Sequence, residues 1–111
     1  MTATVQPVLK LAVNAKNLLV FDGLYNPQTT GGGYVNNATL TCKLYESNGT
    51  TNIAAFTFTV TYITGSDGDY EGYTVKLDMI AAGKRYWVEI TDASGFVYRW
   101  CEAVGYKRGA T

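Results

Sequence analysis

Three carboxylates with alternate spacing are the first residues of this chain that suggest a chemical function. Asp67, Asp69 and Glu71 surround Gly68 at the start of a segment of alternating polarity. Oxygen ligands spaced this closely are the kind that bind calcium, so these three residues are the candidate metal site. A calcium loop recruits more oxygens, however, and Asp-Gly turns are common because the Asp side chain bonds its own backbone. We therefore expect a hydrated turn without a metal, too exposed to raise a carboxyl pKa for acid catalysis.

The rest of the composition argues against catalysis. The chain has no histidine, and so lacks the commonest general base and the commonest metal ligand. Cys101 has Arg99 nearby but no such base beside it, so we expect a structural thiol and not a nucleophile. The glycine run Gly31, Gly32 and Gly33 lacks the lysine and the following helix of a phosphate-binding loop. We therefore expect a protein that is not an enzyme and requires no cofactor.

The longest irregular stretch of the sequence, residues 24–37, is the better candidate for a function. It places Gly31, Gly32 and Gly33 between Tyr25 and Tyr34, and long loops in compact domains are often functional. A tyrosine ring packs while its hydroxyl stays hydrated, which suits a contact surface. We predict that this loop binds other proteins. Three basic residues near the end of the sequence are predicted to make secondary contacts: Arg99, Lys107 and Arg108.

A second interpretation of the aromatic residues is a site for a sugar. The chain has nine Tyr, four Phe and two Trp, and exposed aromatic rings provide apolar surfaces on which a sugar can stack. The aromatic residues expected to form such a platform are Tyr25, Tyr34, Tyr45 and Trp87. If they converge, the chain is a glycan-binding or host-surface adhesion module.

Length and charge set limits on both interpretations. With 111 residues the chain fits a single domain, 1–111, in which we expect residues 1–6 and 106–111 to be mobile arms. Lys plus Arg equals Asp plus Glu at nine each, so no net field favours nucleic acid or a membrane surface. The first residues lack the basic and apolar regions of a signal peptide, so we expect synthesis in the cytoplasm.

The alternation of apolar and polar residues predicts an all-β chain of about seven strands. The predicted strands cover residues 8–13, 18–21, 38–46, 52–63, 70–79, 85–91 and 96–106, with a corner and one helical turn at 81–84. Most are separated by short turns such as Asn48-Gly49, which favour antiparallel hairpins. The pattern therefore predicts an antiparallel β-sandwich of two packed sheets.

Strand parity also predicts which side chains face the core. In residues 85–91 the alternation directs Tyr86, Val88 and Ile90 inward and Trp87, Glu89 and Thr91 outward. If Trp100 faces inward with Tyr98 and Phe96, Cys101 faces outward, whereas Cys42 faces inward with Leu40 and Leu44. This parity favours two free thiols, and the alternative is a bulge near Cys101 that turns its side chain inward and allows a disulfide with Cys42.

Two segments carry a resemblance to a known fold family. Residues 67–75, Asp-Gly-Asp-Tyr-Glu-Gly-Tyr-Thr-Val, resemble the Asp-Gly-x-Tyr signature that enters a late strand in many bacterial and phage immunoglobulin-like domains. Residues 82–90 are similar to the Gly-x-x-Tyr-x-Val-x-Ile strand that follows in those domains. The resemblance implies an immunoglobulin-like sandwich. It also implies that Tyr70 or Tyr73 packs at a sheet corner and bonds back to the chain.

The pattern over most of the chain resembles small proteins of tailed-phage and prophage structural modules. The segments that carry this likeness are Gly23-Leu24, residues 34–41, residues 65–68 and Arg99-Trp100. The resemblance implies a virion structural protein, present in many copies, that decorates the capsid or lies in the head-to-tail region. Its partners would be other virion proteins, such as the major capsid or head-tail proteins.

Overall fold

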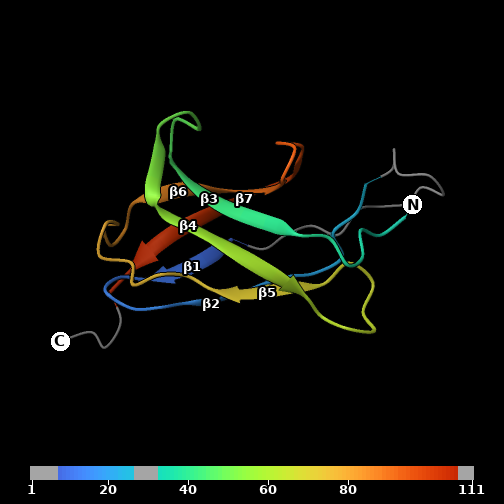
Figure 1. Cartoon of the computed structure of the whole chain (residues 1–111). Helices are drawn as coiled ribbons and strands as arrows, with labels where there is room; N and C mark the ends of the chain where they lie inside the picture. Colours follow the sequence, from blue (N-terminus) through green and yellow to red (C-terminus); the bar gives the residue numbers. More distant parts are fainter. Residues whose placement is uncertain (1–7, 27–32, 108–111) are drawn as a thin grey trace.

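Seven β-strands and no helix make up the part of the chain that the computed structural model describes, residues 8–26 and 33–107 (Figure 1). The strands are β1 (Leu9–Ala12), β2 (Leu18–Phe21), β3 (Leu40–Glu46), β4 (Asn52–Tyr62), β5 (Tyr70–Tyr73), β6 (Arg85–Asp92) and β7 (Val97–Tyr106). The all-β prediction is therefore confirmed, and each predicted strand has a counterpart. Gly31, Gly32, Arg108 and the expected arm 1–6 lie outside the described residues, as does most of the arm 106–111, whereas Tyr106 belongs to β7.

The fifth strand is much shorter than predicted, ending at Tyr73 and not at residue 79. Beyond it the backbone turns to the connection between β1 and β2: the Thr74 amide donates to the Asn17 carbonyl (2.8 Å) and the Leu77 amide to the Ala15 carbonyl (3.0 Å). Residues 74–77 therefore bond to a loop and not to a neighbouring strand. The alternation of residues does not show whether a neighbouring strand is present. The helical turn predicted at 81–84 is also wrong, because non-helical turns occupy residues 78–84.

The strands form one mixed sheet in the order β1-β7-β6-β3-β4-β5-β2, nearly closed into a barrel (Figure 1). Among the described residues every pairing is antiparallel except that of β1 with β7, so the wholly antiparallel prediction is wrong at this pair. Strand β4 joins the two halves, since most of its length pairs with β3 while Thr61 and Tyr62 pair with β5. Residue alternation defines the faces of a strand but not its neighbours.

The core lies where the predicted inward faces meet. In β4, Phe56, Phe58 and Val60 are buried while the threonines between them are exposed, which is the alternation of a strand with one face on the core. In β6, Tyr86, Val88 and Ile90 are buried, which confirms their inward direction.

The outward face of β6 departs from the prediction because Glu89 and Thr91 are also buried. Strand β6 lies between β3 and β7, and in the register Glu89 is opposite Lys43 on one side and Trp100 on the other. Large side chains from both neighbours therefore cover the middle of this face. Burial on the outer face of a central strand depends on its cross-strand neighbours, which the sequence of one strand does not specify.

The predicted orientation of the last strand is wrong for Trp100, Phe96 and Cys101. Cys101 pairs with Val88 and Trp100 pairs with Glu89, and directly opposed residues point to the same face of a sheet. Since Val88 faces the core, Cys101 is buried, while Trp100 is 42% exposed.

Cys101 and Ala103 therefore face inward, whereas Trp100 and Phe96 are exposed. Tyr98 does pack against the core, as predicted, because the register of β6 and β7 shifts beside it.

The two cysteines are free, as predicted, although both are buried. Cys42 lies on β3 and Cys101 on β7, with β6 between them. Two strand spacings amount to about 10 Å, beyond the reach of a disulfide.

Candidate functional site

Tyr25 and Tyr34 meet at the base of the glycine-containing loop. They form an isolated antiparallel bridge, and their rings make an edge-to-face contact with centroids 5.7 Å apart. The Val35 amide donates to the Leu24 carbonyl (2.8 Å), and the Asn26 amide donates to the Gly33 carbonyl (3.2 Å). We call residues 24–26 and 33–35 the tyrosine bridge. Its Tyr34 side chain is 40% exposed, so an aromatic surface reaches solvent here.

Hydrogen bonds from the β4–β5 turn hold the tyrosine bridge on the sheet. The Leu24 amide donates to the Gly68 carbonyl (2.7 Å), and the Gly23 amide donates to Oδ1 of Asp69 (2.7 Å). Asn36 Oδ1 accepts from the Gly68 amide (2.8 Å). These contacts join three segments that are distant in sequence and fix the direction of the bridge.

The Tyr70 hydroxyl holds the second segment of the tyrosine bridge, at Val35, and the chain just after it, at Ala38. This side chain is fully buried, its hydroxyl donates to the Val35 carbonyl (2.9 Å), and it accepts from the Ala38 amide (3.1 Å). Burial raises the pKa of Tyr70, so the hydroxyl stays protonated at neutral pH. The expectation that a tyrosine bonds back to the chain is therefore confirmed for Tyr70, whereas Tyr73 is 65% exposed.

The structure brings only one of the predicted basic residues to the tyrosine bridge. Arg99 donates from Nη2 to the Gly23 carbonyl (3.0 Å), two residues before Tyr25. Lys107 is eight residues further along the same strand direction, or about 26 Å at the rise of an extended chain. Lys107 therefore does not share a surface with Arg99.

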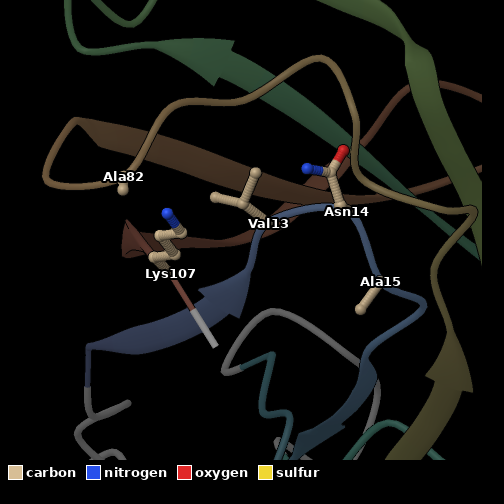
Figure 2. A pocket seen from close by; sticks show the side chains of 5 residues that line it. All are labelled: Val13, Asn14, Ala15, Ala82 and Lys107. Atoms are coloured by element: carbon tan, nitrogen blue, oxygen red, sulfur yellow. The ribbon is translucent and has the colours of Figure 1, made fainter. Parts of the chain in front are cut away.

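Lys107 instead lines a separate pocket of about 470 Å³. Figure 2 shows its side chain across from the β1–β2 connection and near Ala82, which precedes β6. The other lining residues are Val13, Asn14 and Ala15. Their side chains bring no further charge to the pocket.

The candidate calcium residues do not form a ligand set. Asp69 accepts the Gly23 amide, Asp67 is exposed in the turn, and Glu71 lies on β5 opposite Val20 and Thr61. Within residues 8–26 and 33–107 no group of three Asp, Glu, Cys or His side chains is placed to bind a metal ion. Asp69 acts instead as an acceptor that positions the backbone beneath the tyrosine bridge.

The four aromatic residues of the predicted sugar platform do not converge. The tyrosine bridge precedes the start of β3, whereas Tyr45 is near the end of that strand and pairs with Trp87. Tyr45 contacts Trp100 and not the tyrosine bridge: the centroids of the Tyr45 and Trp100 rings are 5.2 Å apart. Trp87 and Trp100, together with Gly49 of the β3–β4 turn, line a pocket of about 200 Å³.

Sequence reasoning missed Trp100 and Glu89 as residues of this second surface. The signal available was the alternation of small residues in Cys101, Ala103 and Gly105, which marks the inward face of β7 and directs Trp100 outward. The burial of Glu89 has no such signal, because it depends on the register of three strands.

No protein-family model matches this chain, and no curated protein or solved structure matches it. Among the described residues there is no helix long and apolar enough to cross a membrane. Functional inference therefore depends on the two aromatic surfaces and on the resemblances within the sequence.

Proposed function

We propose that this chain is a non-enzymatic structural protein of a tailed-phage virion that binds other virion subunits through the tyrosine bridge. The observation that carries the proposal is the Tyr25–Tyr34 ring pair, with Tyr34 exposed, on a base held by hydrogen bonds to the β4–β5 turn. Tyrosine provides a large contact area with few rotatable bonds, so little side-chain entropy is lost on binding. A rigid base lowers that cost further.

The proposed fold is an immunoglobulin-like sandwich. Lettered A to G in chain order, immunoglobulin strands pair as B-E-D in one sheet and C-F-G in the other, which corresponds here to β2-β5-β4 and β3-β6-β7. Tyr86, the second residue of β6, accepts from the Ala81 amide five residues upstream (2.8 Å), as the corner tyrosine near the start of strand F does. The absence of a disulfide distinguishes the chain from antibody domains.

In this proposal the chain decorates the capsid or lies in the head-to-tail region, after synthesis in the host cytoplasm. The partner is a repeated virion protein, such as the major capsid protein or a head-tail protein. Many symmetry-related copies turn a modest contact at each tyrosine bridge into a stable assembly. Arg99 supports this contact from beneath by its bond to the Gly23 carbonyl.

Incorporation into particles tests the proposal. In phage that lack the wild-type gene, the complemented double variant Tyr25→Ala/Tyr34→Ala is compared with wild type by mass spectrometry of purified virions, with copies counted against the major capsid protein. Aromatic residues at the centre of an interface contribute about 2 kcal/mol or more each, so we expect at least a tenfold loss of incorporation.

The matched control is Tyr73→Ala, which removes an exposed tyrosine from β5 instead of the bridge. It should be incorporated normally, and thermal unfolding of all purified variants excludes a folding defect. Normal incorporation of the folded double variant, or absence of the wild-type chain from particles, would overturn the proposal.

A further inference from the structure

We propose that the surface formed by Trp87 and Trp100 is a binding site for one ring of a neutral saccharide. The site is on the outer face of β3, β6 and β7, apart from the tyrosine bridge, and it does not depend on the virion assignment. Its lining is Gly49 and the two indoles, around a volume of about 200 Å³. That volume is below the usual range for drug-sized ligands and suits a single small ring.

The sheet register sets the spacing of the two indoles. Trp87 is opposite Glu102, and Trp100 is opposite Glu89, so the tryptophans are diagonal neighbours on β6 and β7. Diagonal neighbours on one face lie about 7–8 Å apart, within reach of long aromatic side chains. Trp100 is held from the side by Tyr45, with ring centroids 5.2 Å apart at 59°. The apolar surface is therefore preorganised by strand pairing.

A polar group lies under this aromatic surface. Glu89 is only 8% exposed, and its Oε1 accepts from the Tyr45 hydroxyl at 3.3 Å. Burial and the Glu89 carboxylate raise the pKa of Tyr45, so the hydroxyl remains a donor at neutral pH. This carboxylate is buried and does not line the pocket, so its role is to hold the Tyr45 ring that packs against Trp100.

The charges around the site favour a neutral ligand. Glu102, beside Trp87, is paired with Arg85 at 2.5 Å, and Glu46 is paired with Lys84 at 2.6 Å. Lys43 lies next to Glu89 in the register and balances its charge. Without an excess of either sign, the surface does not suit nucleic acid or anionic lipid, which require clustered basic residues. A sugar ring offers apolar C–H groups on one face, which can stack on the two indoles, and hydroxyl groups at its edge that stay in contact with water.

The fluorescence of the protein is a direct readout of this site because Trp87 and Trp100 are the two tryptophans of the chain. Titration of the full chain with glucose, galactose, mannose and N-acetylglucosamine, each also as short oligomers, should shift or quench the emission saturably with at least one sugar. Calorimetry with the same sugar gives an independent Kd. Trp100→Ala should weaken binding about tenfold or more.

The matched variants separate this proposal from the one above. Tyr25→Ala/Tyr34→Ala should bind the sugar as wild type does, even if it fails to enter particles. Trp100→Phe, which retains a ring, should keep part of the affinity and control for loss of the fold. Three results would overturn the proposal. The first is that no sugar changes the emission, and the second is that only choline does, which would indicate a site for a quaternary ammonium group. The third is that dilution alone shifts the emission while sedimentation shows dimers dissociating, which would mean that a second copy of the chain covers the surface.

Discussion

At the level of single residues, the buried thiols show how environment decides reactivity. Burial raises the pKa of Cys101 to about 12, although the nearby Arg99 partly offsets the effect. Burial, together with the proximity of Cys101, raises the pKa of Cys42 as well. A thiolate is the reactive form of cysteine, so both side chains should be inert in the folded protein.

We therefore predict that neither thiol reacts with a disulfide reagent at pH 8 unless the protein opens. Native labelling should be about a thousandfold slower than labelling in denaturant, since opening of the core costs several kcal/mol. The two thiols should become accessible together on unfolding. Rapid labelling of Cys101 alone would contradict the burial of the inward face of β7.

For the buried tyrosines, the surrounding chain decides which group the hydroxyl bonds. The sequence resemblance assigned a corner role to Tyr70 or Tyr73, and Tyr70 does bond back to the chain, at Val35 and Ala38. The shorter link of five residues is made by Tyr86, whose inward direction was predicted but whose hydroxyl bond was not. A motif identifies a buried tyrosine more readily than the partner of its hydroxyl, because that partner depends on the path of another segment.

At the level of elements, the contact between the β4–β5 turn and the segment after β2 positions the tyrosine bridge. A Cβ atom added at Gly68 would lie 2.5 Å from the Leu24 carbonyl oxygen, and the backbone there has a φ of +75°. Gly65, in the same turn, has a φ of +85° but no atom within 4 Å of such a Cβ. The two glycines thus differ in packing but not in backbone strain.

This pair gives a prediction with an internal control. Both Gly65→Ala and Gly68→Ala should lose about 1–2 kcal/mol from positive φ, and Gly68→Ala should lose about 1–3 kcal/mol more from the clash. The free energy of unfolding in urea measures both. In Gly68→Ala, amide exchange should also increase in residues 24–26 and 33–36. Equal losses for the two variants would contradict the close contact.

At the level of the whole molecule, the buried thiols and the buried Tyr70 hydroxyl make the free energy of unfolding depend on pH in the alkaline range. The ordinary pKa of a cysteine in an unfolded chain is near 9.0, whereas burial in the folded protein raises the pKa of Cys101 to about 12. In this range the unfolded chain binds fewer protons than the folded chain, so stability falls as pH rises. Tyr70 adds to the effect, since its pKa is also raised from 10.0 by burial.

We predict that the free energy of unfolding decreases above about pH 9, by up to about 1.4 kcal/mol per pH unit for each thiol. Urea unfolding at pH 7, 9, 10 and 11 measures this slope. Cys42→Ala/Cys101→Ala should be less stable than wild type at pH 7 because it leaves cavities, but its stability should depend less steeply on pH. A flat profile for the wild type to pH 11 would contradict the prediction.

The whole molecule also separates surfaces that looked continuous in the sequence. Arg99 and Lys107 are eight residues apart, yet only Arg99 reaches the segment of the tyrosine bridge. Tyr45 and Trp87 belong with Trp100 and not with Tyr25 and Tyr34. A rigid sheet keeps such sites apart, because residues along an extended strand move away from each other by about 3.3 Å per step.

The sequence by itself determined where the strands lie, apart from the end of β5, and most of their inward faces. These features are local: alternation with period two assigns a face, and turn residues end each strand. Phe56, Phe58 and Val60 in β4, and Tyr86, Val88 and Ile90 in β6, follow this rule.

Only the tertiary structure decided the partners of those strands. The parallel pairing of β1 with β7, the early end of β5 and the outward direction of Trp100 all depend on register between distant segments. The burial of Glu89 beneath the aromatic side chains has the same origin. Many registers are compatible with one alternating pattern, and the choice among them depends on how the completed sheet closes and packs.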